Sequence, residues 1–325
     1  MAGTDQVKPR LVFVHGIGGL RDPQQELAEW KRELAEGARK AGYASEISAL
    51  TMDWSADSAF AYYGDLFDTG EAQGVGSTDE FDEEQAELML DLLGDLLDDL
   101  AGLSEQRGNQ RLARVRAQVR ADGQGQGVGA AGRHLSGVIA AVAAVPGLSW
   151  GAQRLSAGRL LRVLTQPGRY LRRAEPDATG RTLDRRVRER VLQHLDPTRP
   201  AIVVAHSLGT VVALEALAEY NGPVRLLVTI GSPIATRGVV WPRLVPQPPA
   251  TPESVSAWTD FWDSDDIVVP RRTLANLVKP NTAGVLPVPH PLESATLWSH
   301  SASTYLRREE VARPVMKALA VPGRP

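Results

Sequence analysis

The sequence predicts an α/β fold, in which a doubly wound, mostly parallel sheet is interrupted by a large, mostly helical insertion. Three observations lead to this prediction. Short apolar segments alternate with segments of helical periodicity near both ends of the chain. One of these apolar segments runs directly into a serine at the start of a helix. The middle of the chain differs in composition from both ends, and its opposite charges are segregated.

The composition limits the class of protein. The chain has 325 residues, and its 36 basic and 39 acidic side chains give a formal charge of −3. This length suits one large domain or two ordinary ones. Because the charge is nearly balanced, there is no electrostatic indication of a nucleic-acid partner. The absence of cysteine excludes disulfides, thiolate metal sites and cysteine nucleophiles.

The first region, residues 1–54, is predicted to form a strand, a helix and a second strand. Leu11–Val14 is short and apolar, as a buried parallel strand is. A helix is expected to begin at Pro23, because proline suits the first helical position. The second strand is predicted at Glu46–Met52. It would bring Trp54 near the active-site edge of the sheet, where this side chain lines the substrate pocket or, alternatively, lies in the core.

The start of the chain has some features of a secretory leader. Lys8 and Arg10 precede the apolar run Leu11–Leu20. That run, however, contains His15 and three glycines, and no small-residue cleavage pattern follows it. The sequence therefore predicts a cytoplasmic protein that begins with a strand.

The middle region, residues 55–178, is predicted to be an insertion. Residues 65–105 hold fourteen acidic side chains and no lysine or arginine, whereas residues 107–190 hold seventeen arginines. Between them, the glycine- and glutamine-rich stretch 121–132 resembles a flexible linker. Leucines at helical spacing over 88–100 predict an amphipathic helix with a solvated acidic face. The acidic and basic parts could pair with each other inside a helical cap.

One segment of the insertion, residues 133–151, is strongly apolar over Val138–Val145. This run is too short to span a membrane, which takes about 20 apolar residues. The simpler interpretation is a buried helix of the insertion. The alternative is peripheral membrane contact, in which the flanking arginines meet anionic lipid headgroups.

The third region, residues 179–325, returns to alternating strands and helices. Together with residues 1–54 it is predicted to form one core, on which residues 55–178 are inserted as a cap. The predicted elements are a helix at 179–195, a strand at 201–205, a helix at 208–220, strands at 224–230 and 255–262, and a final helix at 301–319.

The most informative stretch is residues 201–210, where an apolar strand leads through His206 and Ser207 into a helix. Ala205 and Gly209 are small and allow a sharp turn, so that the hydroxyl of Ser207 stands exposed above the sheet. The helix start directs N–H groups and partial positive charge toward developing negative charge. The alternative is that Ser207 only caps this helix, but an ordinary cap does not need small residues on both sides.

Three short motifs resemble those of the α/β-hydrolase superfamily, specifically its lipase and esterase branch. They are Val14–Gly19 (VHGIGG), Ala205–Gly209 (AHSLG) and Gly231–Pro233 (GSP). Within that branch the chain is most similar to the lipase-like hydrolases that include the GPI-inositol deacylases. The resemblance covers residues 10–54 and 180–310 and not the insertion. It departs from the commoner pattern at Ala205, which stands where a glycine is usual.

Ester cleavage needs N–H donors for the oxyanion that develops on the carbonyl. The N–H of Leu208, directly after the nucleophile, is expected to be one donor. The resemblance implies that the N–H of Ile17 is the other. We predict that His15, Gly16 and His206, which flank these donors, contact the substrate. The alternative for the first motif, a phosphate-binding loop, lacks both the Lys-Ser/Thr of a P-loop and a GxGxxG pattern.

A general base should follow the serine, since the superfamily's chain order is Ser, acid, His. Two of the six histidines, His290 and His300, satisfy this order. His300 directly precedes a helical segment, as the catalytic histidine does in the family that the chain resembles, and is favoured. His290 lies between two prolines and is otherwise an ordinary residue of a rigid loop.

The acid that orients the base should lie at the end of a strand between Ser207 and His300. Asp266 is favoured, because it precedes a short apolar segment at the spacings that the resemblance implies. Asp263 and Asp265 remain as alternatives. The acid's role would be to hold the imidazole tautomer and stabilise the imidazolium.

These residues predict a serine hydrolase that cleaves a carboxylic ester through an acyl-enzyme. The expected partner is a small-molecule or lipid-like ester, and no metal or organic cofactor is implied. Two alternatives stay open. The same residues could catalyse acyl transfer or cyclisation, or the chain could be a binding protein on this fold without activity.

Overall fold

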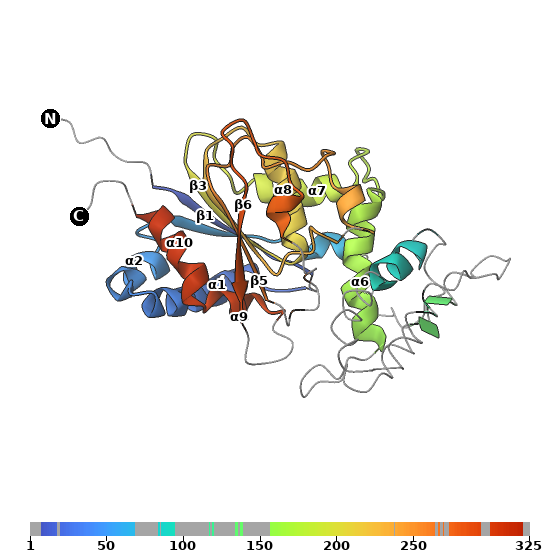
Figure 1. Ribbon diagram of the computed structural model, residues 1–325, viewed down its shortest axis with the longest axis horizontal. Helices are drawn as coiled ribbons and strands as arrows, with labels where there is room; N and C mark the ends of the chain where they lie inside the picture. Colours follow the sequence, from blue (N-terminus) through green and yellow to red (C-terminus); the bar gives the residue numbers. More distant parts are fainter. Residues whose placement is uncertain are drawn as a thin grey trace.

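The computed structural model describes most of both ends of the chain and parts of its middle. The described residues are 8–17, 20–68, 84, 86–94, 117, 119, 134–135, 137–138, 157–236, 238–263, 266, 269, 273–293 and 300–320. Their six strands form one sheet in which every neighbouring pair is parallel, in the order β2-β1-β3-β4-β5-β6 (Figure 1). The strands are β1 (Arg10–Val14), β2 (Asp57–Ala61), β3 (Ala201–His206), β4 (Val224–Ile230), β5 (Trp258–Asp263) and β6 (Pro287–Leu292).

The sheet is built around β3, whose six residues are all buried. Strands buried on both faces are apolar throughout, which is why β1, β3 and β4 were predictable to within a residue. The register places Ala205 beside Val14 on one side and beside Thr229 on the other. Because the carboxyl ends of parallel strands lie at one edge, the segments that follow β1, β3 and β4 meet there.

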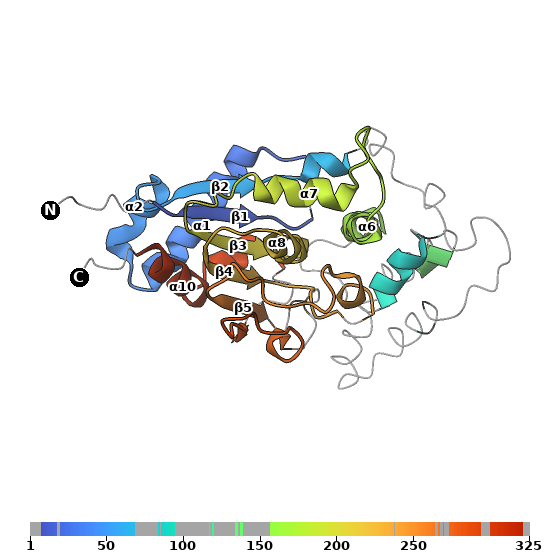
Figure 2. The ribbon, with the colours of Figure 1, turned by 90° about the horizontal axis from the view of Figure 1, so that it is seen from above.

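Helices cover both faces of the sheet (Figure 2). Alternate residues of β1 show the division, since Leu11 and Phe13 pack in one core cluster while Val12 and Val14 pack in the other. One face is covered by α1 (Pro23–Lys40), α9 (Ala302–Leu306) and α10 (Glu309–Leu319), and the other by α7 (Leu183–Leu192) and α8 (Leu208–Ala218). The predicted doubly wound α/β fold is confirmed.

The prediction for the first helix is confirmed in detail. Helix α1 has Pro23 at its first position, and the carboxylate of Asp22 accepts a hydrogen bond from the N–H of Gln24 at 2.9 Å. This cap satisfies one of the donors that a helix start leaves without an intrahelical partner.

A cluster of buried and half-buried polar side chains joins α8 to its neighbours. At its centre is Glu215, whose carboxylate accepts hydrogen bonds from Tyr170 at 2.6 Å and from Arg173 at 2.5 Å. Asp184 accepts from Arg188 at 2.7 Å and from Arg173 at 3.0 Å. We call these five residues the Glu215 cluster. It fastens α7 and the end of α6 (Ala157–Arg172) to the middle of α8.

The second strand was predicted too early. Residues Ala44–Glu46 form a short 3₁₀ turn and α2 (Ile47–Thr51) is helical, whereas the strand is β2, ten residues later. Leu50 and Ile47 are three residues apart, so one helical turn packs both against the core cluster beneath α1. Because β2 pairs with β1, the core extends past residue 54 into the range that was predicted as insertion.

Two further elements near the C-terminus differ from the prediction. Residues 287–292 form the edge strand β6 rather than a loop, and the predicted helix at 301–319 is split into α9 and α10. Proline lacks the N–H of a ladder donor, so prolines are tolerated on an edge strand, and the alternating prolines of β6 conceal it in the sequence.

Part of the middle region can be compared with its prediction. Residues 86–94 are helical, and Leu88 and Leu93 are buried as the amphipathic pattern predicts. The linker 121–132, residues 95–100 and most of 133–151 lie outside the described residues. No described helix is long and apolar enough to cross a membrane.

Candidate active site

Ser207 occupies the turn between β3 and α8 in a backbone conformation that side chains rarely adopt. Its φ is +55° and its ψ is −132°, and its N–H donates to the carbonyl of Ile230 at 3.1 Å. The side chain makes no capping hydrogen bond to α8. The structure thus does not support the alternative that Ser207 is an ordinary helix cap. Such strained positions occur where the hydroxyl is presented for chemistry.

Two glycines allow the loop after β1 to cross this turn. A Cβ at Gly16 would lie 2.6 Å from the Cβ of Ser207, and one at Gly209 would overlap the carbonyl oxygens of His15 and Val14. Only glycine permits backbones to approach this closely. The loop that begins at His15 is therefore pressed directly against the serine.

The hydroxyl, an imidazole and a carboxylate form a continuous hydrogen-bonded chain. The Oγ of Ser207 lies 2.7 Å from Nε2 of His300, and Nδ1 of His300 lies 2.8 Å from Oδ2 of Asp266. A carboxylate only accepts, so Nδ1 carries a proton and Nε2 is left to accept from the hydroxyl. Ser207 directly follows β3, Asp266 lies in the segment after β5, and His300 lies two residues before α9.

The carboxylate of Asp266 is enclosed more completely than the imidazole. The side chain of Asp266 is fully buried, whereas that of His300 is 19% exposed. Oδ2 of Asp266 also accepts a hydrogen bond from the hydroxyl of Tyr305 at 2.7 Å. Burial and the nearby carboxylate raise the pKa of Tyr305 well above its ordinary value, so this hydroxyl stays a donor. Gly231, at φ +59°, packs against Asp266 and His300.

The two described alternatives for base and acid, His290 and Asp263, make other contacts. The ring of His290 is on β6 and stacks on Phe261 at 4.9 Å between centroids. Asp263 ends β5, and its carbonyl accepts from the N–H of Asp266 at 3.1 Å. Asp265 lies outside the described residues. The structure brings together the three residues that the sequence favoured.

The predicted oxyanion donors both adjoin Ser207. Leu208 is the first residue of α8, where helix N–H groups have no intrahelical partner. Ile17 follows Gly16, the residue that packs on Ser207. The rest of the first motif, Gly18 and Gly19, lies outside the described residues.

The predicted substrate contacts of two histidines do not fit their burial. His15 is 1% exposed and burial lowers its pKa to about 3. His206 is 8% exposed, and its ring lies 4.8 Å from that of His300. Burial, and next the neighbouring His300, lower the pKa of His206 well below its usual value. Both rings are therefore neutral and enclosed.

Trp54 does not line the site, and it is not in the core either. It precedes β2 and so lies toward the amino ends of the strands, whereas Ser207 lies at their carboxyl ends. Its side chain is 67% exposed. The prediction is wrong because the second strand was placed too early.

Sequence reasoning missed two residues of this region. Tyr305 was noticed only as part of a helical segment, although it lies on α9, five positions after His300. Tyr63 belongs to no motif, yet its N–H donates to Nε2 of His15 at 3.2 Å. Both act through individual hydrogen bonds to residues distant in the chain or to its backbone, which leave no pattern in the sequence.

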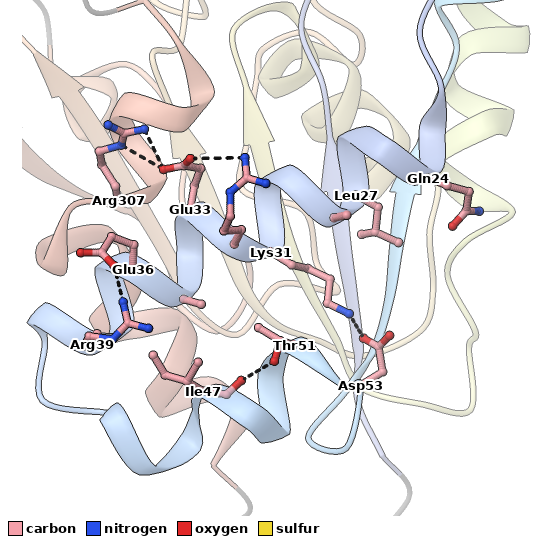
Figure 3. Close-up of a pocket in the computed structure, with 13 residues that line it drawn as sticks. Gln24, Leu27, Lys31, Glu33, Glu36, Arg39, Ile47, Thr51, Asp53 and Arg307 are labelled. Atoms are coloured by element: carbon pink, nitrogen blue, oxygen red, sulfur yellow. Dashed lines mark hydrogen bonds and ion pairs between the residues drawn. The ribbon is translucent and has the colours of Figure 1, made fainter.

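A separate groove of about 660 Å³ lies between α1, α2 and the segment after α9 (Figure 3). Its charges are paired internally, as in Lys31–Asp53 at 2.7 Å and Arg307–Glu33 at 2.8 Å. Among the described residues, no cluster of histidine and acidic side chains could hold a metal ion.

A family model described as the alpha/beta hydrolase fold matches residues 168–280. This range contains Ser207 and Asp266 and ends before His300. Together with the parallel sheet, the match decides the fold. The chain has the α/β-hydrolase fold. No curated protein and no solved structure matches it. The narrower similarity to the GPI-inositol deacylase group stays a prediction, and the family-model match supports a hydrolase-type enzyme in general.

Proposed function

We propose that this α/β-hydrolase cleaves carboxylic esters through an acyl-enzyme formed on Ser207. The observation that supports the proposal most is the hydrogen-bonded chain from Ser207 through His300 to Asp266, with contacts of 2.7 and 2.8 Å. These contacts are within the range required of a nucleophile, its base and the group that orients the base. We call these three residues the triad.

In the first half of the reaction, Oγ of Ser207 attacks the ester carbonyl carbon and its proton passes to Nε2 of His300. The N–H groups of Leu208 and Ile17 stabilise the oxyanion of the tetrahedral intermediate. The C–O bond to the alcohol then breaks, and Nε2 gives its proton to the leaving oxygen. Asp266 stays ionised and stabilises the imidazolium throughout.

In the second half, Nε2 takes a proton from water as the water oxygen attacks the acyl carbon. Collapse of the second tetrahedral intermediate returns the proton to Oγ of Ser207 and releases a carboxylic acid. The products are thus one alcohol and one acid for each water consumed.

The acyl specificity is proposed to be lipase-like, with residues of the middle region acting as a cap. The middle region leaves the sheet after β2 and the turn Gly64–Phe67, at the carboxyl ends of the strands. This is the end that carries Ser207. Caps at this edge of such sheets shape apolar pockets and exclude water.

A fluorophosphonate probe tests the proposal directly. We expect it to label the wild-type protein and not Ser207→Ala, and we expect nitrophenyl esters to be hydrolysed by the wild type alone. A series of acyl chain lengths then tests the lipase-like pocket, which predicts a preference for long chains. Absence of labelling at Ser207 contradicts the proposal, and labelling without ester turnover favours acyl transfer.

A further inference from the structure

The peptide bond between Gly16 and Ile17 is held from one side by the imidazole of His15. Nδ1 of His15 lies 2.6 Å from the carbonyl oxygen of Gly16. Nε2 of the same ring accepts the backbone N–H of Tyr63 at 3.2 Å. A neutral imidazole has one donor and one acceptor nitrogen. Since Nε2 accepts, the proton is on Nδ1, and Nδ1 donates to the Gly16 carbonyl.

This tautomer is enforced by a closed environment. The ring of His15 stacks on that of Tyr63 at 4.0 Å and on that of Phe60 at 5.4 Å between centroids. The hydroxyl of Tyr63 donates to the backbone carbonyl of His15, so Tyr63 holds both the side chain and the main chain of this residue. His15 is 1% exposed and Tyr63 is fully buried. Neither side chain can reach a substrate.

The peptide that His15 holds lies on the nucleophile. Gly16 is so close to Ser207 that an added Cβ would be 3.1 Å from Oγ. In a trans peptide the C=O and N–H point in opposite directions. The hydrogen bond from Nδ1 to the Gly16 carbonyl therefore fixes the N–H of Ile17 on the side of the peptide away from the imidazole.

We infer that His15 is a positioning residue of the oxyanion hole, with its Nδ1–H aiming the Ile17 N–H at the oxyanion and the Tyr63 N–H selecting the tautomer. The inference rests on the proposed function, because it assigns a role within the same site. It replaces the substrate contact that the sequence predicted for His15, and it gives the edge strand β2 a part in catalysis through the segment that follows it.

The test compares His15→Phe with His15→Asn. Phenylalanine keeps an aromatic ring in the stack but has no donor, whereas the amide nitrogen of asparagine stands at the same distance along the side chain as Nδ1. We expect His15→Phe to lower kcat/KM for nitrophenyl esters and the affinity for a trifluoromethyl ketone by the same factor, about 10²-fold, with little change in KM. His15→Asn should recover at least part of both losses.

Val315→Ala is the control, because it removes buried apolar contacts on α10 and does not alter the surroundings of His15 described above. We expect it to lower thermal stability and leave trifluoromethyl ketone affinity unchanged. If His15→Phe binds the ketone as tightly as the wild type, or if His15→Asn recovers nothing, the positioning role is wrong.

The tautomer can be read without any variant. Nitrogen NMR of the wild-type protein should show His15 protonated at Nδ1 and not at Nε2, and a proton on Nε2 overturns the inference even if His15→Phe does not fold. Wild-type fluorophosphonate labelling separates the two hypotheses. Labelling with an Nε2–H tautomer removes the inference alone, whereas no labelling at Ser207 removes the proposed function and the inference with it.

Discussion

Helix α8 contacts two polar clusters that differ in how far their central side chain is enclosed. At its start, the triad keeps one open side, since the side chain of His300 is 19% exposed and Ser207 is held in a strained conformation. In its middle, the carboxylate of Glu215 is 1% exposed and accepts from Tyr170, Arg173 and the N–H of Val245. The carboxylate of Glu215 is therefore closed to a substrate, whereas the triad has a side that a substrate can reach.

The difference teaches that one helix can carry reactivity at its N-terminus and stability at its centre. A buried ionic cluster is costly to break, because the partner of a removed charge remains desolvated. A site with an open hydroxyl and imidazole loses chemistry on substitution while the fold remains. Changes to the two clusters should therefore separate activity from stability.

The largest expected effect is on activity, from Asp266→Asn. An amide at this position can donate to Nδ1 of His300, which would move the imidazole proton to Nε2 and leave no acceptor for the hydroxyl of Ser207. We expect kcat to fall by about 10⁴-fold. Stopped-flow or steady-state ester hydrolysis measures the loss, and circular dichroism should show a folded protein. A loss of less than tenfold would argue against Asp266 as the orienting acid.

The next effect is on stability, from Glu215→Ala. Removal of this carboxylate takes a partner from the half-buried Arg173 and from the buried Arg188, and we expect a loss of about 3–5 kcal/mol in the free energy of unfolding. Urea denaturation measures it, and the folded fraction should keep its fluorophosphonate labelling rate.

Glu219→Ala is the matched control for this change, since it lies one turn later on the same side of the cluster. Glu219 pairs with Arg188 at 3.0 Å, but its side chain is 52% exposed. An exposed ion pair contributes about 0–1 kcal/mol. Equal losses for the two variants would mean that enclosure of Glu215 does not matter.

Acid should affect the surroundings of the triad and the Glu215 cluster over different pH ranges. The pKa of His15 is lowered by burial from its ordinary 6.5 to about 3, so between these values the unfolded chain binds a proton that the native protein does not. Stability is complete above pH 6.5 and falls as the pH falls toward 3, by about 1.4 kcal/mol per pH unit for this residue. The lowered pKa of His206 acts in the same direction.

The Glu215 cluster should respond only to stronger acid. Burial acts to raise the pKa of Asp184, but the hydrogen bonds from Thr182 and Arg188 outweigh it and the net shift is downward from 3.8. Its contribution is lost as the pH falls below that value. Unfolding free energies of the wild type and of His15→Asn, measured from pH 4.5 to 7.5, should show the smaller slope in the variant. Parallel curves would exclude His15 as a source of the acid sensitivity.

The strands that are buried on both faces were predicted from the sequence, and the edge strands were not. Strands β1, β3 and β4 are apolar because both faces are covered, and each was predicted nearly to the residue. The edge strands β2 and β6 were missed, because Asp57–Ala61 has one large apolar residue and Pro287–Leu292 alternates prolines. Edge strands are held in place by pairing with a neighbour, which a local pattern does not record.

The residues of the site could likewise be predicted in part. Ser207, Asp266 and His300 each stand in a local motif that a sequence can show. Their contact depends on the order and register of the parallel strands, which bring the ends of β3 and β5 to one edge. Tyr305 has no motif, because its contribution is one hydroxyl that happens to reach a carboxylate.

The smallest expected effect comes from that hydroxyl. Tyr305→Phe removes the donor 2.7 Å from Oδ2 of Asp266 and keeps the buried ring. Asp266 would still accept from His300, but with less restraint on its orientation. A hydrogen bond to a charged group is worth about 1.5–3 kcal/mol, of which we expect only part to appear in the transition state, giving a three- to tenfold fall in kcat (about 0.7–1.4 kcal/mol) with KM unchanged. Tyr220→Phe is the control, since the hydroxyl of Tyr220 is buried without a hydrogen-bond partner among the described residues. That variant should keep the wild-type kcat. Equal kcat values for the two variants would show that Tyr305 serves packing alone, and the open cluster would then depend on the triad without further support.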